Sequence, residues 1–277
     1  MKFSVSMSVY NGDNSEHFKT ALDSVFNQTA IPDEVVLVVD GPVNENINTV
    51  ITDFENTYET LKVVRLPQNM GHGEARRAGL SACSNNLVAI MDADDICLSY
   101  RFEKQLDAFK HNPDLTIVGG QITEFIDTPD NVAGIRNVPL LDSEIKKYMK
   151  KRCPMNQVTV MFKRNVIEHV GGYLDWYCEE DYYLWIRMGL ANAIFQNLPE
   201  TLVNVRVGKD MYKRRGGLKY FKSEAKLQKY MLDNKIIGVS RYLINVLERL
   251  ILQVLMPNNV RGLVFKLLAR KKVGKDE

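Results

Sequence analysis

The chain has 277 residues, which is long enough for one large α/β domain and a substantial extension. Its hydrophobic content of 45% and charged content of 25% are ordinary for a soluble globular protein. The four cysteines are scattered and form no Cys-x-x-Cys pair, which argues against structural zinc and favours a reducing compartment. No stretch reaches about 18 uninterrupted apolar residues, and the amino terminus lacks a signal-peptide pattern, so we expect neither a transmembrane helix nor a cleaved leader.

The net charge of +2 hides an asymmetry along the chain. Residues 208–277 contain 17 Lys and Arg against 6 Asp and Glu, a net of +11, which leaves −9 for residues 1–207. We therefore predict a body over 1–207 and a basic tail over 208–277. Such a tail is expected to meet an anionic partner, either a membrane surface or nucleic acid.

Apolar runs of strand length alternate with helical patterns at the start of the chain. The expected strands are 3–9, 34–39, 61–66 and 87–91, and the expected helices are about 15–28, 44–58 and 74–84. This alternating order favours a parallel sheet with right-handed crossovers. We predict an α/β, Rossmann-like fold whose mostly parallel sheet is flanked by helices.

Polar residues follow each of these strands. They are Tyr10 and Asn11, Asp40, the Asn69–Gly71 loop, and Asp92–Asp94. The carboxyl ends of parallel strands lie at one edge of the sheet, where open α/β sheets bind ligands. The glycine at 71 would let the backbone approach a ligand closely. The pattern predicts one nucleotide-sized crevice.

The stretch Asn86–Asp95 is the strongest of these signals, because a buried apolar strand stops abruptly at Asp92, Asp94 and Asp95. Two carboxylates in an Asp-x-Asp arrangement can hold a hard divalent cation while leaving sites open to water and substrate phosphate. The alternative is a solvated turn in which Asp95 caps the helix that starts near Ser99.

The segment after these acids alternates helices, short strands and loops. We expect a strand at 115–119, a variable polar loop over 121–138, a strand at 158–162 and a helix starting near Cys178. In that last helix Asp181 shares one face with the apolar residues Leu184, Trp185 and Met188. Packing of those three would aim Asp181 inward. Glu179 and Glu180 are explained well enough as partners of the helix dipole.

Six motifs occur in order across residues 3–207. They are Ser8–Asn11 with Ser24–Thr29; Asp40–Gly41; Asn69, Gly71, Ala75 and Arg76; Asp92–Asp95; Met161–Phe162 with Gly171–Tyr173; and Glu180–Tyr182 with Leu184 and Trp185. Each is weak alone, but together they resemble the family 2 glycosyltransferases with a GT-A fold, the inverting enzymes of bacterial polysaccharide assembly.

The resemblance implies roles for the nucleotide-binding residues. The loop Val9–Asn11 and Asp40 would hold the uracil of a UDP-sugar, with Asn69 and Gly71 in the adjoining loop. Arg76 would approach the nucleotide.

It also implies roles for the reacting groups. Asp92 would contact the ribose or metal-bound water. Beyond Ala93, Asp94 would ligate the Mn²⁺ or Mg²⁺ that bridges the two phosphates. Asp181 would be the general base that takes the proton of the acceptor hydroxyl. A divalent ion would neutralise the departing diphosphate.

Two positions depart from the family pattern. Many relatives have a histidine where this chain has Gln157, and many have a histidine-containing basic segment after the last strand. Here the cations of residues 204–217 would supply the charge: Arg206, Lys209, Lys213, Arg214 or Arg215. The alternative is that they are solvated or face lipid. We take His72 as the only histidine near the site and as a loop residue.

The tail carries two apolar stripes at helical spacing. One runs from Leu243 to Leu255 and the other from Val260 to Leu268, the latter among basic residues. One interpretation is two helices packed on the body or on a second subunit, as in a homodimer. We favour a peripheral contact of residues 241–272 with the cytoplasmic face of a bacterial cell membrane. Nucleic acid is disfavoured, because exposed stacking aromatics are missing beside the basic residues.

Together these patterns predict a metal-dependent inverting glycosyltransferase. It would move a hexose or N-acetylhexosamine from a UDP-sugar to a lipid-linked glycan of a capsule, exopolysaccharide or O-antigen. One alternative is a sugar-phosphate nucleotidyltransferase, although the first strand lacks the Gly-rich phosphate loop that such an enzyme needs. The other is a catalytically silent nucleotide-sugar-binding subunit.

Overall fold

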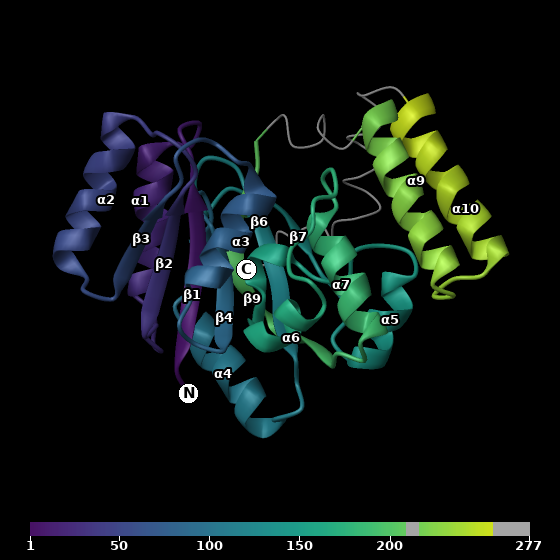
Figure 1. Ribbon diagram of the computed structural model, residues 1–277, viewed down its shortest axis with the longest axis horizontal. Coiled ribbons are helices and arrows are strands. Elements are labelled where there is room, and N and C mark those ends of the chain that lie inside the picture. The colour runs from purple at the N-terminus through teal and green to yellow at the C-terminus, as the bar shows by residue number, and fades with distance from the viewer. Residues whose placement is uncertain (209–215, 257–277) are drawn as a thin grey trace.

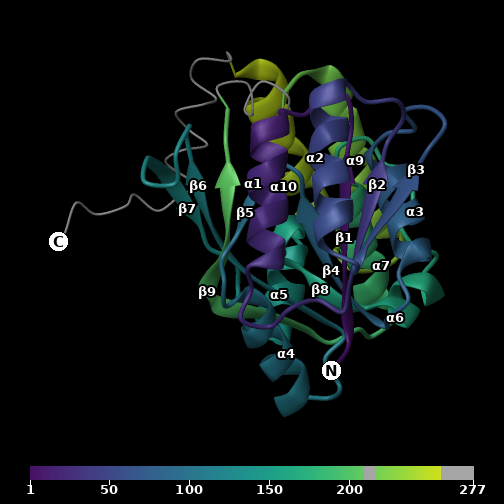
Figure 2. The same cartoon turned by 90° about the vertical axis from the view of Figure 1, so that its left-hand side faces the viewer.

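The computed structural model describes residues 1–208 and 216–256. Its strands form a nine-stranded sheet in the order β3-β2-β1-β4-β8-β6-β9-β5, with β7 paired to β6. Helices lie on both faces of the sheet, and a helical hairpin of α9 and α10 stands at one end of the molecule (Figures 1 and 2). The α/β prediction is confirmed.

The first half of the chain forms the expected parallel strands and crossover helices. The elements are β1 (Phe3–Val9), α1 (Ser15–Phe26), β2 (Glu34–Val39), α2 (Glu45–Thr57), β3 (Leu61–Arg65), α3 (His72–Ala82) and β4 (Leu87–Asp92). Val39 pairs with both Val9 and Arg65, and Asp92 pairs with Ser8. The four strands therefore end level, and we call this side the carboxyl edge.

The second half adds antiparallel pairs, so the sheet is mixed. Its elements are β5 (Ile96–Cys97), α4 (Arg101–His111), β6 (Ile117–Phe125), β7 (Val132–Arg136), α5 (Asp142–Met149), β8 (Met161–Lys163), α6 (Arg164–His169), α7 (Glu180–Leu190) and β9 (Phe195–Arg206). The long strand β9 pairs parallel with β6. Strand β8 lies between β4 and β6 and pairs antiparallel with both.

Two predictions for this half are wrong. The expected loop 121–138 contains most of a β6–β7 hairpin, because its polar residues are satisfied inside the sheet. Gln121 accepts a hydrogen bond from the backbone N–H of Val138 and donates to the carbonyl of Leu198. The expected strand 158–162 is instead a 3-10 turn, Gln157–Thr159, followed by β8.

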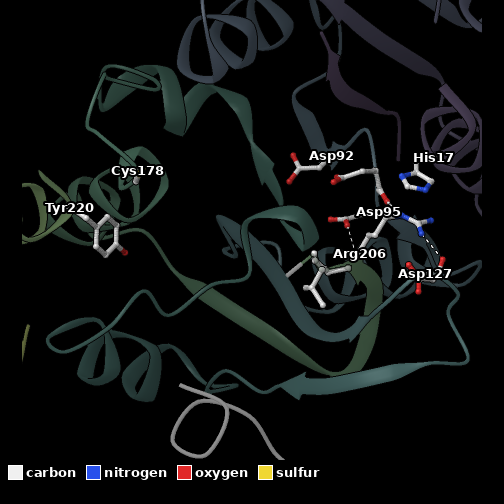
Figure 3. Close-up of a pocket in the computed structure, with 11 residues that line it drawn as sticks. His17, Asp92, Asp95, Asp127, Cys178, Arg206 and Tyr220 are labelled. Carbon is white, nitrogen blue, oxygen red and sulfur yellow. Dashed lines mark hydrogen bonds between the residues drawn. The ribbon is translucent and has the colours of Figure 1, made fainter. Parts of the chain in front are cut away.

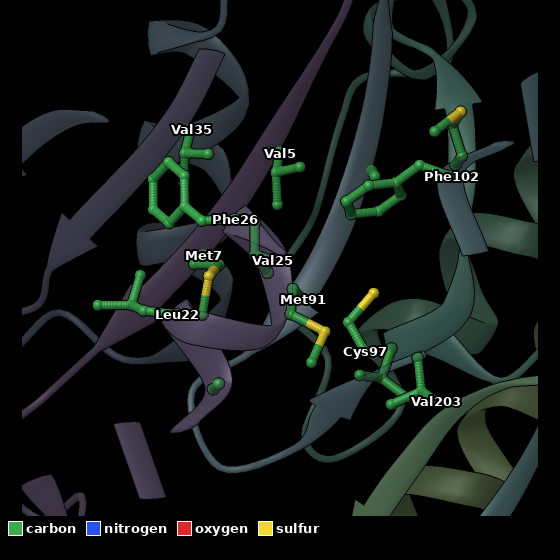
Figure 4. Close-up of a cluster of buried hydrophobic side chains, with 14 of the residues drawn as sticks. Val5, Met7, Leu22, Val25, Phe26, Val35, Met91, Cys97, Phe102 and Val203 are labelled. Carbon is green, nitrogen blue, oxygen red and sulfur yellow. The ribbon is translucent and has the colours of Figure 1, made fainter. Parts of the chain in front are cut away.

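Alternating residues of the central strands feed two cores, as a two-residue side-chain period requires. Val35 and Met91 lie in the core beneath α1, α2 and α4, while Val36 and Ile90 lie in the core beneath α3 and α7. Figure 4 shows the first core, with Val5 and Met7 of β1 meeting Leu22, Val25 and Phe26 of α1. Both faces of β4 are thus buried, which explains its uninterrupted apolar sequence.

Within the described residues after 215, the chain forms α9 (Leu218–Asp233), α10 (Val239–Arg249) and a π-helix over Leu250–Leu255. Leu227 and Met231 of α9 are fully buried in the second core. The helix therefore packs on the body directly. The division at residue 207 stays a prediction, and the expected stripe 260–268 lies outside the described residues.

Candidate active site at the carboxyl edge

The acidic cluster lies where β4 ends. Asp92 is the last residue of β4 and is half-buried, Asp94 is exposed, and Asp95 is buried. Asp95 accepts a hydrogen bond from the backbone N–H of Arg206, at 2.8 Å. The first turn of α4 has no side-chain cap. Asp95 therefore joins the end of β4 to the end of β9, and the interpretation of Asp95 as a helix cap is wrong.

The carboxylates crowd one another. Loss of hydration, together with the charges of Asp92 and Asp13, raises the pKa of Asp94 to about 6. Burial and the neighbouring charges of Asp94 and Asp92 also raise the pKa of Asp95 well above its usual range. Like charges held this close favour a bound cation.

The donor set suits a hard cation only when other ligands complete it. Among residues 1–208 and 216–256, no three His, Cys, Asp or Glu side chains gather in a way that could hold a metal ion alone. Asp92 and Asp94 offer carboxylate oxygens, the ligand type that Mg²⁺ and Mn²⁺ prefer. Such an ion would need phosphate oxygens and water for its remaining positions, as at other phosphate-bound magnesium sites.

A pocket of about 660 Å³ opens beside the acids (Figure 3). Arg206 lines this pocket. The Arg206 guanidinium donates to the backbone carbonyls of Asp94 and Asp127, at 3.2 and 2.7 Å. Of the five cations proposed to face the diphosphate, Arg206 is the one within the described residues that lines this pocket; residues 209–215 lie outside them.

His17 also lines the pocket, so the prediction that His72 is the only histidine near the site is wrong. His17 lies in the first turn of α1, directly beyond the loop that follows β1. Partial burial and the charge of Arg206 lower its pKa. Its position in the first turn of the helix that follows the β1 loop was the signal that could have identified it.

Arg76 bridges the acidic cluster to helix α7. Its guanidinium lies 3.4 Å from the Asp92 carboxylate and 3.1 Å from the Glu180 carboxylate, and its side chain is only 11% exposed. Burial opposes the charge, but Asp92, Tyr173 and Glu180 together hold the pKa of Arg76 above its usual range. Glu180 is therefore an ion-pair partner, and the interpretation of it as a dipole partner alone is wrong.

Asp181 occupies the predicted place in the first turn of α7. Leu184, Trp185 and Met188 on its face are completely buried, as the periodicity indicated. The Asp181 carboxylate accepts from its neighbour's backbone, the N–H of Tyr182 at 2.7 Å, and the Cys153 thiol lies 3.8 Å away. Asp181 is half-buried and directly follows the Glu180 that holds Arg76.

Asp40 organises the neighbouring loop. Its two carboxylate oxygens accept hydrogen bonds from the backbone N–H groups of Met70 and Gly71, at 2.6 and 3.0 Å. Gly41 has φ of +85°, and a Cβ there would come within 2.5 Å of the backbone nitrogen of Asn69. The approach of the Asn69–Gly71 loop to the end of β2 thus depends on two successive residues: the Asp40 carboxylate, which binds the loop backbone, and Gly41, which leaves room for it.

The first loop is more open. Tyr10 and Asn11 are exposed beyond buried Val9, and Asp13 accepts from the Tyr10 backbone N–H at 3.0 Å.

Gln157, at the position of the missing histidine, donates to the Tyr173 hydroxyl at 2.8 Å. Tyr173 in turn lies 6.0 Å from the Arg76 guanidinium. Gln157 therefore contacts the Arg76 bridge through Tyr173.

The wall opposite the acids comes from residues that the sequence did not single out. Cys178 and Tyr220 line the pocket on the other side from Asp92, Asp95 and Arg206 (Figure 3). Tyr220 belongs to α9, over 120 residues beyond the acids in the chain. No local pattern marks such a residue, because a buried tyrosine on an amphipathic helix is ordinary core.

Known proteins resemble this chain over nearly its whole length. The family model described as Glycosyl transferase family 2 matches residues 4–171. The chain is 38% identical to the UDP-Gal:alpha-D-GlcNAc-diphosphoundecaprenol beta-1,3-galactosyltransferase of Escherichia coli, over 98% of this chain and 97% of that protein. It is 37% identical to the amylovoran biosynthesis glycosyltransferase AmsE of Erwinia amylovora, over 90% and 94%.

A solved structure shares the fold. S. aureus TarS 1-349 in complex with UDP-GlcNAc matches with a TM-score of 0.66 at 19% identity, over 98% of this chain and 76% of that one. The predicted GT-A fold and the predicted family are thereby confirmed.

Proposed function

The chain belongs to glycosyltransferase family 2, and from this premise we propose that it is an inverting enzyme that moves a hexose or N-acetylhexosamine from a UDP-sugar to a lipid-linked glycan. The observation that carries the proposal is the ion-pair bridge Asp92–Arg76–Glu180. It joins the acids at the nucleotide end of β4 to the helix that presents Asp181. A binding site and a candidate base are thus held in one unit.

The nucleotide-sugar would lie along the carboxyl edge. In this proposal the loop from Val9 to Asn11 and the Asp40-organised loop Asn69–Gly71 flank the uracil, and Arg76 approaches the nucleotide. Because both carboxylate oxygens of Asp40 accept hydrogen bonds from the backbone N–H groups of Met70 and Gly71, its main contribution would be to shape that loop. Arg206 would add positive charge toward the diphosphate.

Asp94, with Asp92 directly or through water, would hold Mn²⁺ or Mg²⁺ in the donor site. When bound, the ion would act as a Lewis acid for the departing diphosphate. The protein's own part would be to hold the carboxylates of Asp92 and Asp94 close together at the end of the buried strand β4, where they can bind the ion.

Asp181 would be the general base. Inverting transfer is a single in-line displacement, in which the acceptor hydroxyl attacks the anomeric carbon from the face opposite the leaving UDP. A carboxylate within hydrogen-bond reach takes the hydroxyl proton as the new bond forms. No carboxylate nucleophile is needed. Asp181 is accessible enough to meet an acceptor and is anchored by a buried helix face.

The acceptor proposal draws on the Escherichia coli relative, whose name gives it a GlcNAc on diphosphoundecaprenol. A polyprenyl-linked sugar of this kind would be presented at a membrane. For this chain we propose the cytoplasmic face of a bacterial cell membrane, with the product a unit of a capsule, exopolysaccharide or O-antigen.

An exposed apolar stripe on α10 and the π-helix supports a membrane contact. The stripe consists of Val239, Leu243, Ile244, Leu247, Ile251, Val254 and Leu255, each at least 36% exposed. The opposite face buries polar residues, Asn245, Arg249 and Gln253. Every helix within the described residues is too short or too polar to span a bilayer. An apolar face turned outward fits a helix lying in the headgroup boundary, and a second copy of the chain is the alternative partner for it.

The decisive experiment measures UDP release from a panel of nucleotide sugars with Mn²⁺ or Mg²⁺ and a polyprenyl-linked acceptor. Release from one UDP-sugar that stops with EDTA supports the proposal and names the sugar. Nucleotide-sugar binding without turnover on any acceptor would favour the silent-subunit alternative. Release of pyrophosphate from UTP and a sugar phosphate would favour the nucleotidyltransferase. A folded protein that binds no UDP with metal present would overturn the proposal.

A further inference from the structure

One face of α9 holds the loop that leads into α7. The Ser223 hydroxyl donates to the Tyr177 carbonyl at 2.6 Å, and the Trp176 indole donates to the Ser223 carbonyl at 3.2 Å. One turn earlier on α9, the Tyr220 hydroxyl donates to the Glu179 carboxylate at 2.7 Å. These three bonds fix successive parts of the loop, so the start of α7 depends on α9.

Glu179 is the residue through which this dependence reaches Asp181. It directly precedes α7, and only 6% of it is exposed. Burial, with the nearby charges of Glu224 and Asp181, raises its pKa well above the usual range. A buried carboxyl needs hydrogen-bond partners to be tolerated, and Tyr220 supplies one. Asp181 follows two residues later.

The loop backbone is held in an unfavourable conformation between these contacts. Cys178 has φ of +58°, a left-handed conformation that non-glycine residues adopt mainly where the surroundings impose it. Its side chain and that of Tyr220 both line the pocket on the wall opposite the acids (Figure 3). Cys178 therefore lies in the pocket wall, between two residues, Tyr177 and Glu179, that are hydrogen-bonded to α9.

Polar contacts also connect α9 to α10. Glu224, one turn after Tyr220 on α9, lies 3.1 Å from the Arg249 guanidinium. Arg249 also donates to the Lys151 carbonyl at 2.9 Å. The helix that carries the apolar stripe is thus connected through buried polar contacts to the residue before α7.

We propose that Tyr220 is a positioning residue of the acceptor side. Its hydrogen bond to Glu179 fixes the first turn of α7, and with it Asp181, so the C-terminal hairpin is part of the catalytic arrangement as well as a surface for a membrane. The inference deepens the proposed function, since it rests on Asp181 acting at the acceptor.

The test compares Tyr220→Phe with Tyr242→Phe in the full chain. Tyr242 lies on α10, and within the described residues its hydroxyl makes no hydrogen bond. The control therefore removes the same hydroxyl group without breaking a hydrogen bond. We expect Tyr220→Phe to lower kcat about tenfold, less than the roughly 10²-fold that a 1 Å misplacement of a catalytic group can cost, while the UDP-sugar Kd stays unchanged. Amides of residues 180–186 should exchange about fivefold faster with deuterium, as loss of one hydrogen bond implies. Tyr242→Phe should leave both unchanged.

A double-mutant cycle isolates the bond. Glu179→Gln keeps an acceptor oxygen for Tyr220 and should retain most of the activity, whereas Glu179→Ala should match Tyr220→Phe. The Tyr220→Phe/Glu179→Ala double variant should be no slower than either single variant. Multiplying effects would overturn the inference, and so would an unchanged kcat with a lower Tm. If the wild type transfers no sugar, the proposed function fails, but amide exchange still tests whether Tyr220 positions α7.

Discussion

The two sides of the crevice are built in different ways. The nucleotide side consists of loops that directly follow β1, β2, β3 and β4; strand register aligns their starting points, and Asp40 connects the loops after β2 and β3. The opposite side consists of the start of α7 and one face of α9, which are brought together by side-chain contacts such as Tyr220 to Glu179. Arg76 joins the two sides through Asp92 and Glu180.

This difference separates the two tasks of a transferase. Register in a buried sheet resists slippage, because a one-residue shift would turn every side chain to the other face. In the proposed function, this rigidity suits the binding of the nucleotide. A wall assembled from tertiary contacts can change with the C-terminal helices, so it would suit the recognition of the acceptor.

The largest expected effect comes from the nucleotide side. Asp94→Ala removes the exposed carboxylate beyond β4, and we expect transfer to fall roughly 10³-fold, which corresponds to the several kcal/mol that a metal ligand contributes to charge stabilisation. Wild type treated with EDTA should fall equally, as measured by UDP release. The control is Asp107→Ala, which removes an exposed acid paired with Lys110 on α4. Near-wild-type turnover of Asp94→Ala would contradict a metal role.

Breaking the bridge between the two sides should have the next largest effect. Arg76→Met leaves Asp92 and Glu180 without their shared cation, so we expect kcat/KM to fall about 10²-fold and unfolding free energy to drop by about 2–4 kcal/mol. Chemical denaturation and steady-state kinetics measure the two. Arg77→Met is the matched control on the same helix, because Arg77 forms an exposed pair with Glu74 worth less than about 1 kcal/mol. Equal effects of the two variants would refute the bridge.

Substitutions in the apolar stripe should separate membrane contact from nucleotide binding. Leu243→Ser with Leu247→Ser removes two side chains that are 59% and 57% exposed. We expect co-sedimentation with anionic vesicles to fall about tenfold, consistent with the apolar area lost, and the UDP-sugar Kd to stay unchanged. Ile31→Ser changes a residue that is 68% exposed elsewhere and should have no effect. If the stripe variant instead converts a dimer to a monomer in solution, a second copy covers the stripe.

The smallest effect is expected at the opposite edge of the sheet. Glu34 accepts hydrogen bonds from Ser4 and from the Ser84 backbone and hydroxyl. Burial opposes its charge, but these bonds hold its pKa below the usual 4.5. The stabilisation is therefore present above pH 4.5 and is lost as pH falls through the lower pKa of the folded state. Glu34→Gln should cost about 1 kcal/mol at pH 7 and progressively less as the pH falls below 4.5, without changing kcat. A constant difference at all pH values would contradict this.

The sequence was sufficient for the features that depend on local pattern. The strand ends at Asp40 and Asp92 follow from unbroken apolar runs that stop at an acid, and the face shared by Asp181 and Trp185 follows from the helical period. It was insufficient where pairing is distant: Glu180 to Arg76 spans 104 positions, and Arg206 to Asp95 spans 111. The β6–β7 hairpin was missed because Gln121 is polar yet satisfied inside the sheet.

In the proposed enzyme, nucleotide binding belongs to the side of Asp94 and proton transfer to the side of Asp181. The most direct test measures UDP-sugar affinity by calorimetry and sugar transfer by product formation in Asp181→Asn, with metal present. We expect an unchanged Kd and a transfer rate reduced roughly 10³-fold, because the amide cannot take the acceptor proton. Transfer at the wild-type rate, or an equal loss of UDP-sugar binding, would contradict it.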